Sequence, residues 1–212
     1  MTPLSPELIR IQAALHPLDA APTGPSWNIE ELVEELAGLP LAAESAIAAV
    51  LVGLVPRLDG LQVLLTLRTG ALRLHAGQVS FPGGRIEPYD VDACAAAIRE
   101  TTEEVGILPS QIQPLGYLDP LATITGFRVV PLVAVVTPEY IPRHDPREVD
   151  DVFEIPFDFL MAPANLKRIG IEFQGRARSV LEFVDPDGSG RRIWGASASI
   201  LLNLRHRLEI AR

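Results

Sequence analysis

Apolar residues along this chain gather in short runs, and their lengths and spacing predict strands and helices. Residues 44–57 and 61–68 are strand-like apolar runs, and the turn sequence LDG at 58–60 joins them into a predicted β-hairpin. A short strand is expected over residues 78–84, where a proline and two glycines interrupt it. This part of the chain therefore predicts consecutive strands without an intervening helix.

The second half of the chain predicts further strands. Residues 127–137 form an apolar run, and Pro131 within it predicts a place at a sheet edge or at a bulge. Residues 148–161 predict a strand that runs into a helix. Residues 171–195 predict a hairpin around the turn Asp187-Gly188.

Four segments predict helices: 5–16, 28–39, 92–105 and 197–212. Ser5 is the expected N-cap of the first, and Gly38 and Gly106 are expected to end the second and the third. The last segment has an apolar stripe at helical spacing, made of Ile200, Leu201, Leu204 and Leu208. Strands and helices mix without strict alternation, so the prediction is one α/β domain whose mixed sheet has helices on both faces. We expect residues 1–40 to form a helical extension packed on a core domain of residues 41–212.

Composition narrows the class of protein. Hydrophobic residues make up 48% of the 212 residues and charged residues 21%, which is typical of a soluble globular protein with a well-supplied core. No apolar run reaches the ~18 residues that cross a bilayer, and the N-terminus lacks the features of a signal peptide. The lone cysteine, Cys94, excludes an intramolecular disulfide and is expected to be buried. We therefore expect a cytoplasmic protein.

The charge pattern points to a small anionic ligand. A net charge of −9 argues against general binding to nucleic acid or to an anionic membrane. Positive side chains nevertheless gather between residues 57 and 85, against Asp59 alone: Arg57, Arg68, Arg73, His75 and Arg85. These residues either form an anion site or are scattered, solvated side chains.

Three carboxylates at the end of the predicted helix 92–105 are the strongest chemical signal. Glu100, Glu103 and Glu104 lie on about one face, where like charges repel each other and the helix dipole disfavours anions. A divalent cation would remove both penalties, and oxygen ligands suit Mg²⁺ or Mn²⁺. A solvated acidic face is the alternative. The preceding pair Gly83-Gly84 favours the cation site, because glycine lets the backbone approach a ligand closely.

Residues 83–107, GGRIEPYDVDACAAAIRETTEEVGI, resemble the Nudix box, G-x5-E-x7-R-E-U-x-E-E-x-G-U with U a bulky apolar residue. The matching positions are Gly84, Arg99, Glu100, Thr101, Glu103, Glu104, Gly106 and Ile107, although Thr101 is less bulky than usual. Asp90 replaces the first glutamate, and eight residues instead of seven separate it from Arg99. The resemblance implies a Nudix-type α/β/α sandwich and a structural salt bridge between Asp90 and Arg99.

The upstream residues 64–84, LLTLRTGALRLHAGQVSFPGG, are similar to a motif of the coenzyme A diphosphatase branch of that family, L-L-T-x-R-S-x-x-L-R-x-H-x-G-Q-V-x-F-P-G-G. Thr69 replaces the serine. The longer box spacing is typical of the same branch, and residues 148–156 and 191–202 resemble its later segments. The resemblance implies metal-dependent hydrolysis of coenzyme A to 3′,5′-ADP and 4′-phosphopantetheine.

The resemblance also implies roles for single residues. Glu100, Glu103 and Glu104 would hold Mg²⁺ or Mn²⁺ together with the carbonyl of Gly84, and Gly83 would let the diphosphate approach. The general base would be Glu103 or the downstream Glu148, with the box residue favoured. The candidates for contacts with coenzyme A are Arg68, Arg73, His75 and Gln78. Trp194 either flanks the pantetheine arm or only packs against other side chains of the protein, and the second role is favoured.

Two other functions fit part of the pattern. One is a broader dinucleotide diphosphatase acting on ADP-ribose or NADH, which would lack the upstream motif in this form. The other is a non-catalytic binding protein of the Nudix fold, which would normally have lost box glutamates. The expected partner is coenzyme A, with no nucleic acid and no membrane, in a monomer or a homodimer.

Overall fold

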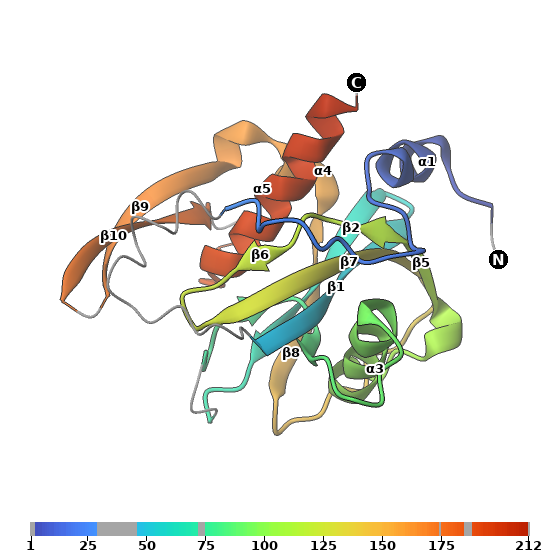
Figure 1. The fold of residues 1–212 in the computed structure, drawn as a ribbon, viewed down its shortest axis with the longest axis horizontal. Helices are drawn as coiled ribbons and strands as arrows, with labels where there is room; N and C mark the ends of the chain where they lie inside the picture. The colour runs from blue at the N-terminus through green and yellow to red at the C-terminus, as the bar shows by residue number, and fades with distance from the viewer. Residues whose placement is uncertain (1–2, 29–45, 72–74, 174, 185–187, 212) are drawn as a thin grey trace.

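A mixed β-sheet lies between helices on its two faces (Figure 1). The computed structural model describes residues 3–28, 46–71, 75–173, 175–184 and 188–211. The helices are α1 (Pro6–Ala13), α3 (Ala93–Val105), α4 (Phe157–Met161) and α5 (Gly195–Ile210), with 3-10 turns η1 (Pro109–Gln111) and η2 (Pro163–Asn165). The strands are β1 (Ala46–Arg57), β2 (Gly60–Arg68), β3 (Val79–Ser80), β4 (Gly83–Arg85), β5 (Ile112–Tyr117), β6 (Leu121–Ala122), β7 (Phe127–Val136), β8 (Val149–Pro156), β9 (Leu166–Phe173) and β10 (Arg176–Phe183).

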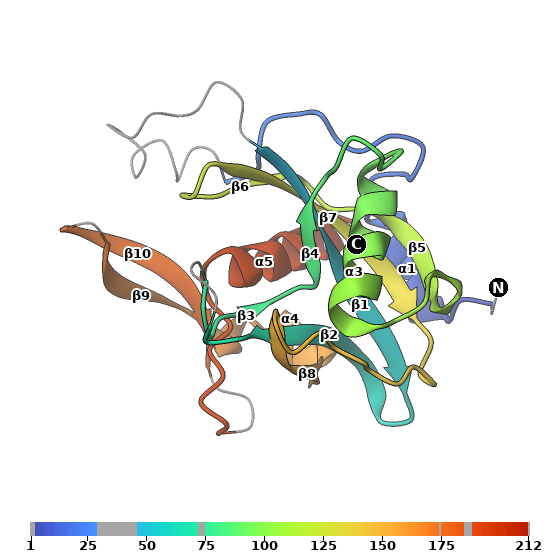
Figure 2. The same ribbon diagram turned by 90° about the horizontal axis from the view of Figure 1, so that it is seen from below.

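The sheet places β1 at its centre. Its strand order is β3-β2-β1-β7-β5, with β4 beside β1, β6 beside β7 and β8 beside β2. Strands β1 and β7 are parallel, and the other pairs are antiparallel. Figure 2 shows α3 and α5 on opposite sides of this sheet. The predicted α/β/α sandwich is thus confirmed.

Two apolar clusters cover the two faces of the sheet. On one face, the alanines of α3 pack with Leu51 and Val55 of β1. On the other, Ile200, Leu201 and Leu204 of α5 pack with the adjacent β1 residues Val52 and Leu54, together with side chains of α1 and α4. The alternation of β1 side chains between the faces follows from the two-residue period of a strand.

Several local signals correctly predict the element in which they lie. The β1–β2 hairpin closes through the pair Arg57 and Gly60, as the LDG turn predicts. Helix α3 has Asp92 as its N-cap, whose carboxylate accepts from the Ala95 amide at 2.7 Å. It ends at Gly106, which has a left-handed φ of 78°. Glycine is suited to that position because it carries no Cβ.

The predicted edge position of the strand 127–137 is wrong, because β7 lies inside the sheet between β1 and β5. The alternative of a bulge is closer, since the pairing of β5 with β7 is irregular between Pro114 and Gly116. Pro131 is tolerated there because of its neighbours. Its carbonyl accepts from the Leu118 amide at 3.0 Å, and Leu118 belongs to the link between β5 and β6. The missing N–H of Pro131 therefore falls where the adjacent strand is interrupted.

The hairpin near the C-terminus is also placed differently. Strands β9 and β10 pair from Leu166–Phe183 to Phe173–Arg176, so the hairpin closes between these last two residues and well before Asp187-Gly188. Beyond β10, a single bridge between Glu182 and Trp194 brings the chain back toward α5. Asp187, the first residue of the predicted turn, lies outside the described residues. Figure 1 shows the β9–β10 hairpin extending from the body of the molecule.

The N-terminal helix packs on the core. Ser5 accepts from the Leu8 amide at 3.3 Å and so caps α1, while Leu8 and Ile11 are buried against the α5 face of the sheet. The predicted helix over 28–39 and the predicted boundary at residue 40 lie outside the described residues, so the division of the chain stays a prediction. No helix in the described ranges is long and apolar enough to span a bilayer.

A polar cluster ties the N-terminal segment to α5. The Asp119 carboxylate is 2.7 Å from His16 Nε2, 3.0 Å from Arg207 Nη1 and 3.0 Å from Asn203 Nδ2. Burial disfavours the ionised form of Asp119, but hydrogen bonds from these three side chains outweigh it and lower its pKa to about 2. Arg207 also donates to the Ala14 carbonyl at 2.7 Å.

We expect this cluster to stabilise the fold in a pH-dependent way. Because the folded-state pKa of Asp119 is depressed, its contribution is complete above the pKa of the unfolded state, near 3.8, and is lost as the pH falls toward 2. We compare the free energy of unfolding of the wild type with that of Asp119→Asn. The difference between the two should be about 1–2 kcal/mol larger at pH 5 than at pH 2. Urea unfolding of both proteins across this range measures it. A constant difference would contradict the prediction.

Candidate active site

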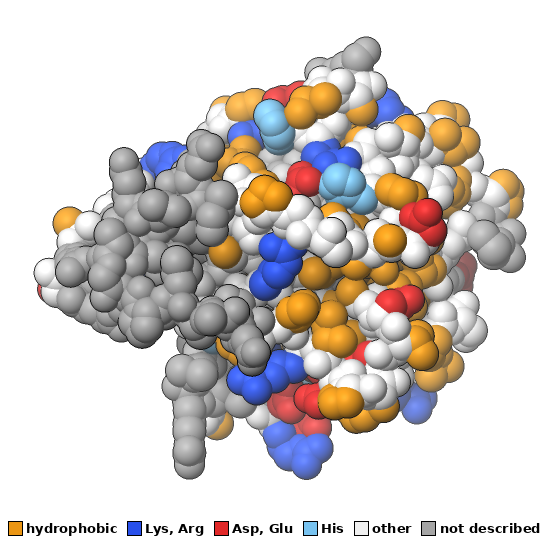
Figure 3. Space-filling view, in the orientation of Figure 1, with side chains coloured by type: hydrophobic (Ala, Val, Ile, Leu, Met, Phe, Trp, Pro, Cys, Tyr) orange, Lys and Arg blue, Asp and Glu red, His pale blue; other side chains and the backbone are white. Residues whose placement is uncertain are grey.

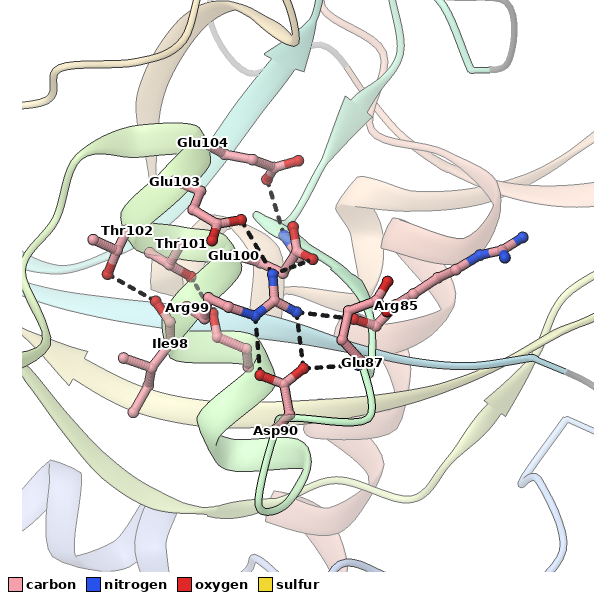
Figure 4. Close-up of polar contacts among 12 residues, drawn as sticks. Arg85, Glu87, Asp90, Ile98, Arg99, Glu100, Thr101, Thr102, Glu103 and Glu104 are labelled. Atoms are coloured by element: carbon pink, nitrogen blue, oxygen red, sulfur yellow. Dashed lines mark hydrogen bonds and ion pairs between the residues drawn. The ribbon is translucent and has the colours of Figure 1, made fainter.

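The last two turns of α3 face the glycine turn at β4, as Figure 4 shows. Glu104 is 4% exposed, and its Oε2 accepts from the Gly83 amide at 3.0 Å. Its Oε1 is 3.4 Å from Arg68 Nη1 at the end of β2. Burial raises the pKa of Glu104 to about 7, and the negative charges of Glu100 and Glu148 act in the same direction.

The glycine pair sets the distance between the turn and the helix. A Cβ on Gly84 would lie 2.6 Å from the carboxyl carbon of Glu100, so the backbone touches that carboxylate. A Cβ on Gly83, whose φ is 154°, would overlap the Ala49 carbonyl of β1. Both positions therefore require glycine, but for different reasons. A side chain on Gly83 would push β4 away from β1, and a side chain on Gly84 would displace the Glu100 carboxylate.

We predict that Gly84→Ala lowers activity more than stability. The added methyl group must displace the Glu100 carboxylate, which is the end of a flexible side chain, whereas at Gly83 it meets backbone. Activity should fall by about 10- to 100-fold, the range typical when a metal-site residue is misplaced. Steady-state kinetics and thermal unfolding of both variants test this. Loss of folding in Gly84→Ala, with Gly83→Ala intact, would contradict it.

Arg99 links the parts of the box. Its guanidinium donates to both oxygens of Asp90 at 2.9 Å, to Glu100 at 2.8 Å and to Glu103 at 3.1 Å. It also donates to the Arg85 carbonyl at 3.1 Å. This hydrogen bonding lowers the pKa of Asp90, although burial opposes it. The geometry is thus a two-pronged salt bridge despite the unusual residue and spacing.

Glu103 and Glu148 lie at the exposed side of this cluster. The Glu103 side chain is 59% exposed. Glu148 precedes β8 and comes close because its loop packs on the end of α3, where the Asp145 amide donates to the Glu104 carbonyl at 3.0 Å. Burial raises the pKa of Glu100, and the charges of Glu103 and Glu148 add to that rise against the effect of Arg99. The four glutamates therefore share one electrostatic environment.

The donor set suits a hard divalent cation. Among the described residues, no three acidic, histidine or cysteine side chains converge closely enough to hold a metal ion as they stand. Arg99 accounts for this, because it draws Glu100 and Glu103 toward itself. The exposed Glu103 can turn away from it, and the raised pKa values of Glu100 and Glu104 indicate negative charge without a full counter-charge. Oxygen ligands of this kind fit Mg²⁺ or Mn²⁺.

The predicted basic stretch is only partly assembled. Arg68 lies at the carboxylates, but Arg57, the last residue of β1, lies opposite the start of β2 and pairs with Glu154 at 2.6 Å. Arg85 stacks on Phe127 at 5.2 Å. Arg73 lies outside the described residues. Figure 3 shows the positive side chains of one face scattered among acidic and apolar ones.

The described residues of the upstream motif beyond β2 return to the end of that strand. The Arg68 amide donates to the Gln78 carbonyl at 2.9 Å, and the Gly77 amide donates to the Arg68 carbonyl at 3.1 Å. His75 Nδ1 is 2.9 Å from Gln78 Oε1, and the backbone of His75 has a φ of 58°. His75 and Gln78 thus hold the loop beside Arg68.

Sequence reasoning missed a cavity beside this loop. Its volume is about 450 Å³, and it is lined by Leu67, Ala76, Gly77, Gln78, Ser189, Gly190, Arg191, Arg192 and Trp194. Trp194 was expected mainly to pack, and nothing in the local pattern marked the two arginines. Cys94, which was expected to be buried, is only half-buried in α3, and this burial raises the pKa of its thiol to about 11.

The comparisons with known proteins show the family of the chain. A family model described as the NUDIX domain matches residues 48–173, more than half of the chain. The protein therefore belongs to the Nudix family. Nudix hydrolases cleave the pyrophosphate bond of nucleoside diphosphate derivatives, act on small molecules, and generally use divalent ions such as Mg²⁺ or Mn²⁺.

Similar proteins carry the same family name. The chain is 38% identical over 158 residues to the uncharacterized Nudix hydrolase NudL of Escherichia coli (strain K12), covering 74% of this chain and 80% of that protein. NudL of Shigella boydii serotype 18 gives the same values. Among solved structures, the Nudix hydrolase RenU from M. smegmatis is 20% identical, with a TM-score of 0.46 over 54% of this chain and 72% of that one.

Proposed function

We propose that this Nudix hydrolase cleaves the diphosphate bond of coenzyme A, giving 3′,5′-ADP and 4′-phosphopantetheine. The observation that carries the proposal is the contact between the two sequence motifs. Arg68 belongs to the motif that resembles the coenzyme A branch, and its guanidinium is 3.4 Å from the buried Glu104 of the box. The motif that resembles the coenzyme A branch therefore lies in contact with the carboxylate cluster.

The residues of the site would have different roles in the hydrolysis. Glu100, Glu103 and Glu104, with the carbonyl of Gly84, would hold Mg²⁺ or Mn²⁺. When bound, such an ion neutralises the diphosphate charge and lowers the pKa of a water ligand. Glu103 is our candidate for the general base, with Glu148 the other glutamate near the site. Arg68 offers donors to a phosphate oxygen, while Asp90 and Arg99 keep the loop and helix together.

Product analysis tests the proposal. The protein would be incubated with coenzyme A and, separately, with ADP-ribose, each with Mg²⁺ or Mn²⁺ and each with EDTA, and the products separated by chromatography. The expected result is metal-dependent formation of 3′,5′-ADP from coenzyme A. Glu104→Gln is the inactive control.

Two outcomes would replace the proposal. Turnover of ADP-ribose without turnover of coenzyme A would establish a broader dinucleotide diphosphatase and remove the substrate assignment. Absence of turnover with both compounds in the folded protein would favour a binding protein of the Nudix fold.

A further inference from the structure

We propose that the cavity lined by Arg191, Arg192 and Trp194 binds the 3′-phosphorylated adenosine end of the substrate. The two arginines would bind the 3′-phosphate, and the tryptophan would stack on the adenine. The proposal rests on the proposed function, since it assigns the part of coenzyme A that simpler diphosphate compounds lack. It also makes the proposed function more specific, because it names the residues that would select coenzyme A as the substrate.

The cavity adjoins the carboxylate cluster through the end of β2. Leu67 lines the cavity, and the next residue, Arg68, reaches Glu104. Gln78 lines it too, and its carbonyl accepts from the Arg68 amide at 2.9 Å. In Figure 2 the end of β2, β3 and the start of α5 lie together, and Ser197 of α5 donates to the Val79 carbonyl of β3 at 3.0 Å. The cavity and the carboxylate cluster therefore both lie at the end of β2, on either side of its backbone.

The spacing of the two places suits the nucleotide end of coenzyme A. Its ribose carries the diphosphate at the 5′ position and a monophosphate at the 3′ position, so both anionic groups are attached to the same sugar. A site for the 3′-phosphate must lie close to the site for the diphosphate. The cavity meets that requirement, because Gln78 lines it and pairs through its carbonyl with the backbone amide of Arg68.

The lining has the donors and the aromatic surface that this group needs. Arg191 pairs with Asp151 at 2.8 Å and stacks on Phe153 at 4.3 Å. Arg192 pairs with Glu182 at 2.6 Å and lies over the Trp194 ring at 5.1 Å. These contacts orient both guanidinium groups, and each has five N–H donors, more than one carboxylate uses. Arginine matches the geometry of phosphate oxygens.

The size and polarity of the cavity favour a nucleotide over the pantetheine arm. Its volume of about 450 Å³ lies within the ~300–1,000 Å³ usual for small-molecule sites. Small residues at 76, 77, 189 and 190 leave room for a flat ring beside Trp194. An extended apolar arm would instead favour a groove without charged walls. The start of α5 at Gly195 adds the partial positive charge of a helix N-terminus.

Equilibrium binding tests the assignment without turnover. Calorimetric titration of the full-length protein with 3′,5′-ADP and with 5′-AMP isolates the 3′-phosphate. The wild type should bind 3′,5′-ADP at least about tenfold more tightly, as expected for charge-assisted hydrogen bonds. The double variant Arg191→Gln/Arg192→Gln should lose this difference and keep its affinity for 5′-AMP. Arg10→Gln, an exposed arginine of α1, is the matched control.

Kinetics with coenzyme A and dephospho-coenzyme A separate this proposal from the proposed function. The double variant should lower kcat/KM for coenzyme A to the value for dephospho-coenzyme A. Equal losses with both substrates, or none, would overturn the assignment while the function stands. Failure to hydrolyse coenzyme A, with selective 3′,5′-ADP binding retained, would overturn the function alone. If the double variant does not fold, Arg192→Gln alone serves, because that side chain is half exposed.

Discussion

Glu104→Gln should abolish metal-dependent hydrolysis while leaving the protein folded. The carboxylate is nearly inaccessible and burial raises its pKa to about 7, so its ionised form is a buried charge that a cation would neutralise. Gln keeps the shape and still accepts from the Gly83 amide, but it offers a metal ion no charge. We expect kcat to fall on the order of 10³-fold, as when a principal electrostatic group is removed from an active site.

The same variant gives a second readout that does not depend on turnover. Without metal, Glu104→Gln should be at least as stable as the wild type, because it removes a buried charge. With Mg²⁺ or Mn²⁺, the wild type should gain thermal stability and the variant should gain less. Glu209→Gln, an exposed glutamate near the end of α5, is the control for the amide substitution. Full activity in Glu104→Gln would remove this residue from the metal site.

Local patterns predicted the elements that carry the chemistry. The helix 92–105 could be read from its composition and its closing glycine, and the β1–β2 hairpin from its turn. The interior place of β7 could not be predicted, since the effect of Pro131 depends on the break between β5 and β6 across from it. A proline in a strand is a local signal, whereas the strand order is a property of the whole sheet.

The same distinction holds within the site. The box identifies Glu104 as a metal ligand candidate, but its burial and its contact with Arg68 depend on the meeting of α3 with β2. The cavity brings together residues from about 67 to 78 and from 189 to 194, separated by more than half the chain. No pattern within either segment shows that they meet. The resemblance to known motifs marked part of each segment without showing their contact.

Arg99→Met should reduce both stability and activity, because Arg99 joins three acidic side chains to the loop. The side chain of Asp90 is 4% exposed and has both its oxygens hydrogen-bonded to Arg99. Removing the guanidinium leaves Asp90 without these donors and frees Glu100 and Glu103 to repel each other. We expect Tm to fall by roughly 5–10 °C, as when a buried ion-pair network is broken, with a loss of activity of about 100-fold.

Arg99→Lys separates charge from geometry in this network. Lysine keeps the positive charge but cannot donate in parallel to both oxygens of Asp90 and also reach the Arg85 carbonyl. Its Tm and kcat should therefore fall between those of the wild type and Arg99→Met. The double variant Asp90→Asn/Arg99→Met should lose less stability than the two single changes added together, because the partners are removed jointly. Thermal unfolding of the four proteins forms a complete cycle, and additive losses would show that the Asp90–Arg99 pair contributes no coupling to the fold.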